Sequence, residues 1–232
     1  MEFKKENIGH QSPWLAEIYN QYFSNVIDEF FVEIGVGFTA NWHLMKKPRR
    51  IVPPDQLVRG FSNTIEFLEH GWSGLYIEPI KELLTNELIP LLDKILTLEQ
   101  QTRVQFANCA VSDSNKVMVM GKDQELCGDS KEEPDKDFVP YDWKGRKVNC
   151  RKTSEILIEH NVPNIIDVMS IDVESHELYV LRGMDFSKHL PKLIIIETCI
   201  TPHNKILEIL PKEYKFIKGD SLNSVIINKN LL

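Results

Sequence analysis

Residues 30–38 read FFVEIGVGF, an apolar run that carries Glu33 and is followed by Gly35 and Gly37. Apolar and aromatic residues favour a buried strand, and glycine permits a tight turn after it. A turn without side chains also lets a ligand approach the backbone closely. The motif therefore predicts either a strand that presents an acidic residue and a glycine turn to a nucleotide-like cofactor, or simply a buried strand with a tight turn.

Similar apolar runs recur along the chain and alternate with amphipathic segments. Residues 63–71 have helical spacing, with Ser62 or Asn63 placed to cap the helix. Residues 81–96 are also helical by period, and Pro90 predicts a kink. Strands separated by helices predict an α/β fold with a mostly parallel sheet. The predicted strands lie at 30–35, 73–79, within 103–113, 165–175 and 192–200, before a terminal hairpin at 213–230.

Composition and charge exclude several classes of protein. The chain has 232 residues, of which 42% are hydrophobic and 26% charged, with a net charge of -7. The acidic balance argues against nucleic-acid binding, which needs a basic face. The four cysteines form no CxxC pair, so no zinc site is expected. No apolar run reaches the roughly 18 residues of a membrane span, and no signal-peptide core is evident, so we expect a soluble, cytoplasmic protein.

Polar residues follow the predicted strands. In a parallel sheet the ligand lies at the carboxyl ends of the strands, where the strand order reverses. These positions could form a binding edge, although strand ends that meet water are polar in any case. The residues concerned are Glu33, Glu78, Asn108, Asp172 and Glu197.

The glycine motif alone gives weak support for a dinucleotide. The pattern GxGxxG is met only in its looser form, with Ala40 in the third position, and the acidic residue expected about 20 residues later is missing. Glu78 is the acid that ends the next strand, and residues 39–61 look inserted before it. An adenosine-bearing ligand other than NAD fits better, because it needs a glycine turn, an acid for the ribose and a polar group near adenine.

Several motifs together resemble the FkbM-type family, a branch of the class I S-adenosylmethionine-dependent methyltransferases. The motifs are FFVEIGVGF, SNTIEFLEHGWSGLYIEP, ANCAVSD, MSIDVESHELYVLRGMDF and PKLIIIE, and the similarity runs from about residue 30 to 228. It implies a Rossmann-like sheet of seven strands flanked by helices, and methyl transfer from S-adenosylmethionine, usually to a hydroxyl oxygen. We therefore expect an N-terminal helical extension at 1–29 and a methyltransferase domain at 30–232, with insertions at about 39–61 and 112–147.

The resemblance also implies a set of cofactor-binding residues. The glycine turn and its acid would line the methionine side, Glu78 would bind the ribose hydroxyls, and Asp172 would lie where cofactor and acceptor meet. The chain departs from the family pattern at Phe38, and at Ser175, where the family has glycine. The implied cofactor-binding residues are Glu33, Gly35, Gly37, Asn63, Glu78, Asn108, Cys109, Ala110 and Asp172.

The acidic turn after the fourth predicted strand would carry the chemistry. A hydroxyl acceptor needs a base to draw off its proton, and Asp172 and His176 are the candidates. His176 could instead be a packing residue, and Glu174 could favour the positive end of the following helix. A divalent metal held by these three side chains is possible but not favoured.

The expected partner is a small acceptor, such as a saccharide or another hydroxylated metabolite. Two other functions stay open at this point. One is a binding protein that keeps the methyltransferase fold without turnover, and the other is a nicotinamide-dependent oxidoreductase.

Overall fold

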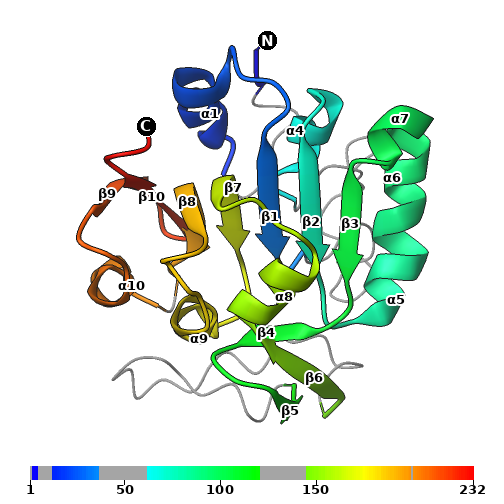
Figure 1. Cartoon of the computed structure of the whole chain (residues 1–232), viewed down its shortest axis with the longest axis vertical. Helices are drawn as coiled ribbons and strands as arrows, with labels where there is room; N and C mark the ends of the chain where they lie inside the picture. The colour runs from blue at the N-terminus through cyan, green and yellow to red at the C-terminus, as the bar shows by residue number, and fades with distance from the viewer. Residues whose placement is uncertain (1, 5–11, 37–61, 121–144, 200) are drawn as a thin grey trace.

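The computed structural model describes residues 2–4, 12–36, 62–120, 145–199 and 201–232. A sheet of seven strands has the order β3-β2-β1-β7-β8-β10-β9 (Figure 1). β10 runs antiparallel to β8 and β9, and the other neighbouring strands are parallel, so the predicted α/β class and terminal hairpin are confirmed. The strands are β1 (Phe30–Ile34), β2 (Ser73–Ile77), β3 (Val104–Ala107), β7 (Ile165–Ile171), β8 (Leu190–Glu197), β9 (Tyr214–Gly219) and β10 (Asn223–Asn228).

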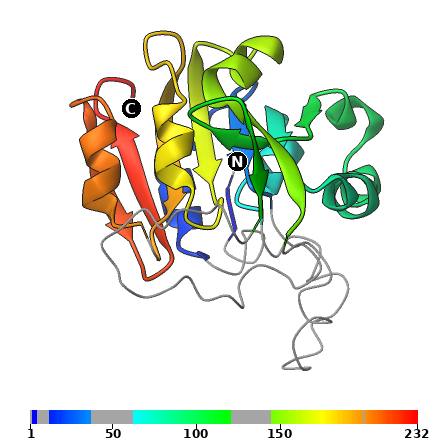
Figure 2. The ribbon, with the colours of Figure 1, turned by 90° about the horizontal axis from the view of Figure 1, so that it is seen from below.

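Helices cover both faces of this sheet. Successive side chains of a strand point to opposite faces, so the core divides in two. Phe31 and Tyr76 lie in the cluster that includes α1 and α4, whereas Val32 and Leu75 lie in the cluster with α8, α9 and α10. Figure 2 shows α10 and the terminal hairpin at one end of the molecule and α5 to α7 at the other. The helices are α1 (Leu15–Phe23), α4 (Ile65–Glu69), α5 (Lys81–Leu83), α6 (Ile89–Ile95), α7 (Leu98–Gln101), α8 (Thr153–Glu159), α9 (Glu177–Arg182) and α10 (His203–Ile209).

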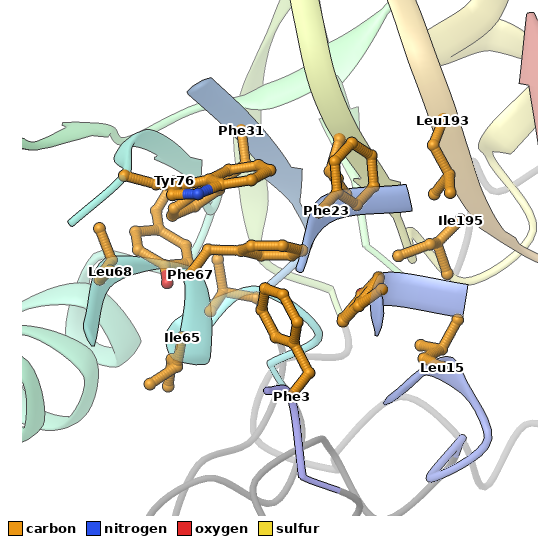
Figure 3. Packing of buried hydrophobic residues seen from close by; sticks show 14 of the residues in the cluster. Phe3, Leu15, Phe23, Phe31, Ile65, Phe67, Leu68, Tyr76, Leu193 and Ile195 are labelled. Atoms are coloured by element: carbon orange, nitrogen blue, oxygen red, sulfur yellow. The ribbon is translucent and has the colours of Figure 1, made fainter. Parts of the chain in front are cut away.

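Aromatic rings dominate the core on the α1 side (Figure 3). Phe67 of α4 stacks on Trp72 with ring centroids 4.2 Å apart, and Phe23 of α1 meets Trp72 edge to face at 5.4 Å. Phe3 packs against Phe67 at 5.0 Å. Such pairs stabilise a fold by about 0.5–1.5 kcal/mol each beyond their burial. These contacts pack the residues before β1 against the sheet. The predicted domain boundary at residue 30 stays a prediction.

The third predicted strand is divided in the structure. β3 ends at Ala107, and β4 (Ala110–Ser112) leaves the large sheet to pair with β6 (Lys147–Lys152). β5 (Lys116–Val119) completes a second sheet in the order β4-β6-β5. This sheet was not predicted, because its strands lie in a polar region. Residues 121–144 of the predicted 112–147 insertion, and the whole 39–61 insertion, fall outside the described residues.

The helical segment 81–96 is interrupted just before Pro90, where the sequence predicted a kink or a break. A π-helical turn, η2 (Leu84–Leu88), separates α5 from α6, and the proline lies in the first turn of α6. Proline has no N–H to donate and its ring clashes with the preceding turn, so the regular ladder is interrupted just before it.

Candidate functional site

The strand order reverses between β1 and β7, and the candidate site lies at the carboxyl ends of these strands. Asp172 N donates to Ile34 O at 2.9 Å, and Gly35 N donates to Ile77 O at 2.9 Å. These bonds continue the ladder by one residue and bring the segments after β1, β2 and β7 together. The predicted position of the site therefore lies at the reversal of strand order, the place where ligands bind in sheets of this kind.

Glu33 is the acidic residue at the end of β1, and its side chain is buried. It accepts hydrogen bonds from Ser62 Oγ at 2.6 Å, Thr64 Oγ1 at 2.5 Å and the Asn63 backbone N–H at 2.9 Å. Burial raises the pKa of Glu33 to about 7, although these three donors act in the opposite direction. The segment before α4 thus encloses this carboxyl group.

Ser62 and Thr64 are functional candidates that the sequence analysis missed. Ser62 or Asn63 was expected as the N-cap of α4, but that position is held by Thr64, whose side chain makes no capping bond. Ser62 Oγ, two residues earlier, accepts from the backbone N–H groups of Thr64 and Ile65, at 3.2 Å each, and at the same time donates to Glu33. A hydroxyl residue before a helix indicated only the first of these roles.

Gly35 has a φ of +78°, which favours glycine. A Cβ atom at this position would lie 1.7 Å from Asp172 O. The glycine is therefore required by the close approach of the Asp172 backbone. Gly37, the second predicted glycine, lies outside the described residues.

The turn after β7 brings together four carboxyl groups, those of Asp172, Glu174, Glu177 and Glu197. Asp172 and Glu174 are partly exposed, and the side chain of Glu197, at the end of β8, bonds to Asp172. Burial, followed by the charge of Glu33, raises the pKa of Asp172 to about 6. Burial and then neighbouring acids raise the pKa of Glu174 to about 8 and that of Glu197 to about 9. The cluster therefore retains protons near neutral pH.

Glu177 closes this turn from the start of α9. Its Oε1 accepts from Ser175 N at 3.1 Å and Val173 N at 3.4 Å, and its Oε2 accepts from Thr201 Oγ1 at 2.9 Å. Burial raises the pKa of Glu177 to about 7. The sequence predicted Glu197 at the same binding edge as Asp172 and Glu177 in the same acidic turn, but not these hydrogen bonds, because they depend on the shape of the turn.

His176 is buried between α9 and the second sheet. Its Nε2 lies 3.1 Å from Ser112 Oγ, and its ring stacks on Tyr179 with centroids 4.4 Å apart. These contacts fit the packing role that was considered for it. Pairing with Asp172 in catalysis stays a prediction.

The residues predicted near ribose and adenine follow β2 and β3. Glu78 is buried, and its Oε1 accepts from Ile80 N at 2.7 Å. Asn108 Nδ2 donates to the carbonyls of Glu78 at 2.9 Å and Pro79 at 3.1 Å, which joins the two strand ends. Cys109 packs in the core, where burial raises the pKa of its thiol to about 11, and Ala110 begins β4.

In the part of the chain that the structure describes, no three His, Cys, Asp or Glu side chains are grouped so that they could hold a metal ion. None of the described helices has the length and apolar character needed to cross a membrane.

Residues 51–218 match the sequence model of the methyltransferase FkbM domain. The chain belongs to the FkbM methyltransferase family. The family resemblance noted in the sequence is thus confirmed, and β1 with its glycine turn lies before the matched range. A comparison of this FkbM-family protein with curated proteins found no significant match.

Two solved structures are similar to this FkbM-family protein. The methyltransferase FkbM of Methylobacillus flagellatus is 15% identical, with a TM-score of 0.50, and the similarity covers 97% of this chain and 48% of that one. The chain thus spans about half the length of that protein. Precorrin 8w decarboxylase of Methanobacterium thermoautotrophicum is 13% identical, with a TM-score of 0.46 and coverage of 98% and 99%.

Ser175→Gly is expected to stabilise this FkbM-family protein. Ser175 has a φ of +76°, a conformation in which a side chain is strained. Removing the strain outweighs the greater freedom of glycine in the unfolded chain, for a net gain of about 0.5–1 kcal/mol in the free energy of unfolding. Urea denaturation measures it. Asn161→Gly, at a φ of +52°, is the control and should gain less, because asparagine tolerates this region. A loss of stability in Ser175→Gly would contradict the strain.

Proposed function

We propose that the protein is an S-adenosylmethionine-dependent methyltransferase that acts on a hydroxyl oxygen of a sugar or another small hydroxylated acceptor. The observation that carries this proposal is the meeting of Glu33, Asp172 and Glu197 at the reversal of strand order, within an FkbM-family domain. Acidic groups at this edge suit a cationic ligand, and the partly exposed Asp172 and Glu197 are open to one.

The residues present fit S-adenosylmethionine. The ligand carries a sulfonium and an ammonium charge, which the acidic cluster would stabilise. Glu33 and Gly35 would line its methionine side together with Asn63, Glu78 would accept from the ribose hydroxyls, and Asn108 to Ala110 would lie near adenine. When bound, S-adenosylmethionine supplies an activated methyl group, so alignment of the acceptor accounts for much of the catalysis.

Asp172 is the proposed base. Its pKa of about 6 makes it a stronger base than an ordinary carboxylate, yet it is still ionised at neutral pH. The proton of the acceptor hydroxyl would pass to an Asp172 carboxylate oxygen, and the hydrogen bond from Glu197 would keep Asp172 ionised before this transfer. His176 is the second candidate, although its ring is engaged with Ser112 and Tyr179.

A binding protein without turnover is the second candidate function. The departure at Ser175 and the engagement of His176 favour it. Calorimetry with S-adenosylmethionine and NAD, followed by methyl transfer to a panel of saccharides, separates the possibilities. Binding and transfer support the enzyme, binding without transfer supports the second candidate, and binding of NAD alone would refute both and indicate an oxidoreductase.

Glu78→Gln tests the cofactor assignment. The change keeps an acceptor for Ile80 N but replaces the carboxylate that would bind the ribose. A charge-assisted hydrogen bond contributes about 1.5–3 kcal/mol, so we expect the dissociation constant for S-adenosylmethionine to rise by at least about tenfold. Isothermal calorimetry measures it, with Glu82→Gln on the exposed start of α5 as the control. Equal affinity of the two variants would remove Glu78 from the site.

A further inference from the structure

Tyr19 of α1 reaches the candidate site from outside the matched family range of residues 51–218. Its side chain is fully buried, and its hydroxyl donates to the backbone carbonyl of Asn63 at 2.9 Å. Burial and the nearby charge of Glu33 raise the pKa of Tyr19 well above its usual value, so the hydroxyl stays a donor. Helix α1 thus makes a polar contact with the segment that encloses Glu33.

Asn63, which accepts the hydrogen bond of Tyr19, also donates hydrogen bonds to residues of two strands. Its backbone N–H donates to Glu33 Oε1 at 2.9 Å, and its Nδ2 donates to Ser170 Oγ of β7 at 3.1 Å. The residue therefore connects β1, β7 and α1 at the edge of the sheet where the strand order reverses. A shift of Asn63 would move a donor away from Glu33.

The carbonyl that Tyr19 holds belongs to the rigid peptide plane between Asn63 and Thr64. Thr64 donates to Glu33 Oε2 through its hydroxyl at 2.5 Å, and that hydroxyl also lies 3.3 Å from Tyr76 Oη. Because this plane is rigid, a hydrogen bond to its carbonyl also fixes the Cα atom of Thr64, from which the threonine side chain extends. The tyrosine thus restrains the residues on both sides of one peptide bond, and each of them donates to the same carboxylate.

Packing keeps Tyr19 in place. Its ring lies 4.6 Å from that of Phe67 and 5.4 Å from that of Phe3, between centroids. The residues of this core come from both sides of β1 in the sequence, as Figure 3 shows for Phe3, Phe23 and Phe67. A ring held on several sides gives its hydroxyl a defined position, as a positioning group requires.

We infer that Tyr19 is a positioning residue for the methionine side of the S-adenosylmethionine site, and that α1 therefore contributes to the geometry of this site. The inference rests on the proposed function. Tyr19 acts through Asn63 and Thr64, whose hydrogen bonds fix the position and the charge of the Glu33 carboxylate at the edge of the site.

Tyr19→Phe tests the inference, because it removes the hydroxyl and keeps the ring. Loss of one buried hydrogen bond corresponds to about a five- to tenfold rise in the dissociation constant for S-adenosylmethionine, measured by calorimetry. Loosened donors also leave Glu33 harder to ionise, so the pH midpoint of S-adenosylmethionine binding should move upward. Tyr22→Phe is the matched control, since Tyr22 is a half-buried tyrosine of the same helix, and it should change neither quantity.

The outcomes separate the inference from the proposed function. If the wild-type protein binds no S-adenosylmethionine, the proposed function fails and the inference fails with it. If the wild-type protein binds and Tyr19→Phe binds with the same affinity and pH midpoint, the inference alone is overturned. A lower thermal midpoint of the ligand-free Tyr19→Phe protein, with an unchanged thermal shift on adding S-adenosylmethionine, would show a purely structural role and would also overturn it.

Discussion

Gly35→Ala is expected to destabilise the protein by about 4 kcal/mol, because two costs combine. The residue has a φ of +78°, where a side chain costs about 1–2 kcal/mol. The new methyl group would also lie 1.7 Å from Asp172 O, so the backbone after β7 must move away. Overpacking of this kind costs about 1–3 kcal/mol and more where backbone has to shift. Urea denaturation measures the loss.

Gly71→Ala provides a matched control for this prediction. Gly71 has a φ of +86°, but a Cβ atom there meets nothing within 4 Å. Only the backbone strain of about 1–2 kcal/mol should appear. The difference between the two losses in free energy of unfolding then gives the cost of the steric conflict between a Cβ atom at position 35 and the Asp172 carbonyl. Equal losses would show that this approach relaxes without cost.

The stability of the ligand-free protein is expected to fall as the pH rises from about 5 to 8. The pKa of Glu33 is about 7 in the folded protein, above its ordinary value of 4.5, so the folded state binds the proton more tightly than the unfolded state. The stabilisation is complete below pH 4.5 and is lost as the pH rises through about 7. A shift of this size corresponds to about 3 kcal/mol for Glu33 alone. Urea denaturation at several pH values measures it.

Glu33→Gln identifies the contribution of this one residue. The amide keeps the shape of the side chain and does not titrate, so the slope of stability against pH should be reduced. Some slope should remain, because the pKa of Glu177 is also raised to about 7 and that of Glu174 to about 8. Glu208→Gln, which removes an exposed carboxylate of α10, is the control and should keep the full slope. A full slope in Glu33→Gln would exclude Glu33 as its source.

The fold could be predicted because the alternation of apolar strand and amphipathic helix recurs along the chain. The buried strands are continuous apolar runs such as Leu193 to Ile196, and helical segments separate them. The same rule of parallel sheets predicted that Glu33 and Asp172 lie at one edge, as the structure shows. The second sheet escaped prediction because β6 reads KVNCRK, in which charged residues mask the alternation.

Details of the candidate site could not be predicted in the same way. Glu174 and Ser175 both have positive φ angles, of 53° and 76°, although neither is glycine. This turn directs the acidic side chains toward Glu197, and residue types alone do not reveal it. The contact of His176 with Ser112 likewise depends on how α9 packs against β4. Such contacts follow from the assembled fold.

The position of β10 sets the order in which this sheet can be completed. β10 is the last strand in the sequence, yet it lies between β8 and β9, and all six of its residues are buried. β9 therefore has no place in the sheet until the segment that follows it has arrived. During synthesis on the ribosome the chain emerges from its N-terminus, so β8 must wait with one edge uncovered until residues 223–228 have left the exit tunnel. The final hairpin closes that edge against pairing with other chains.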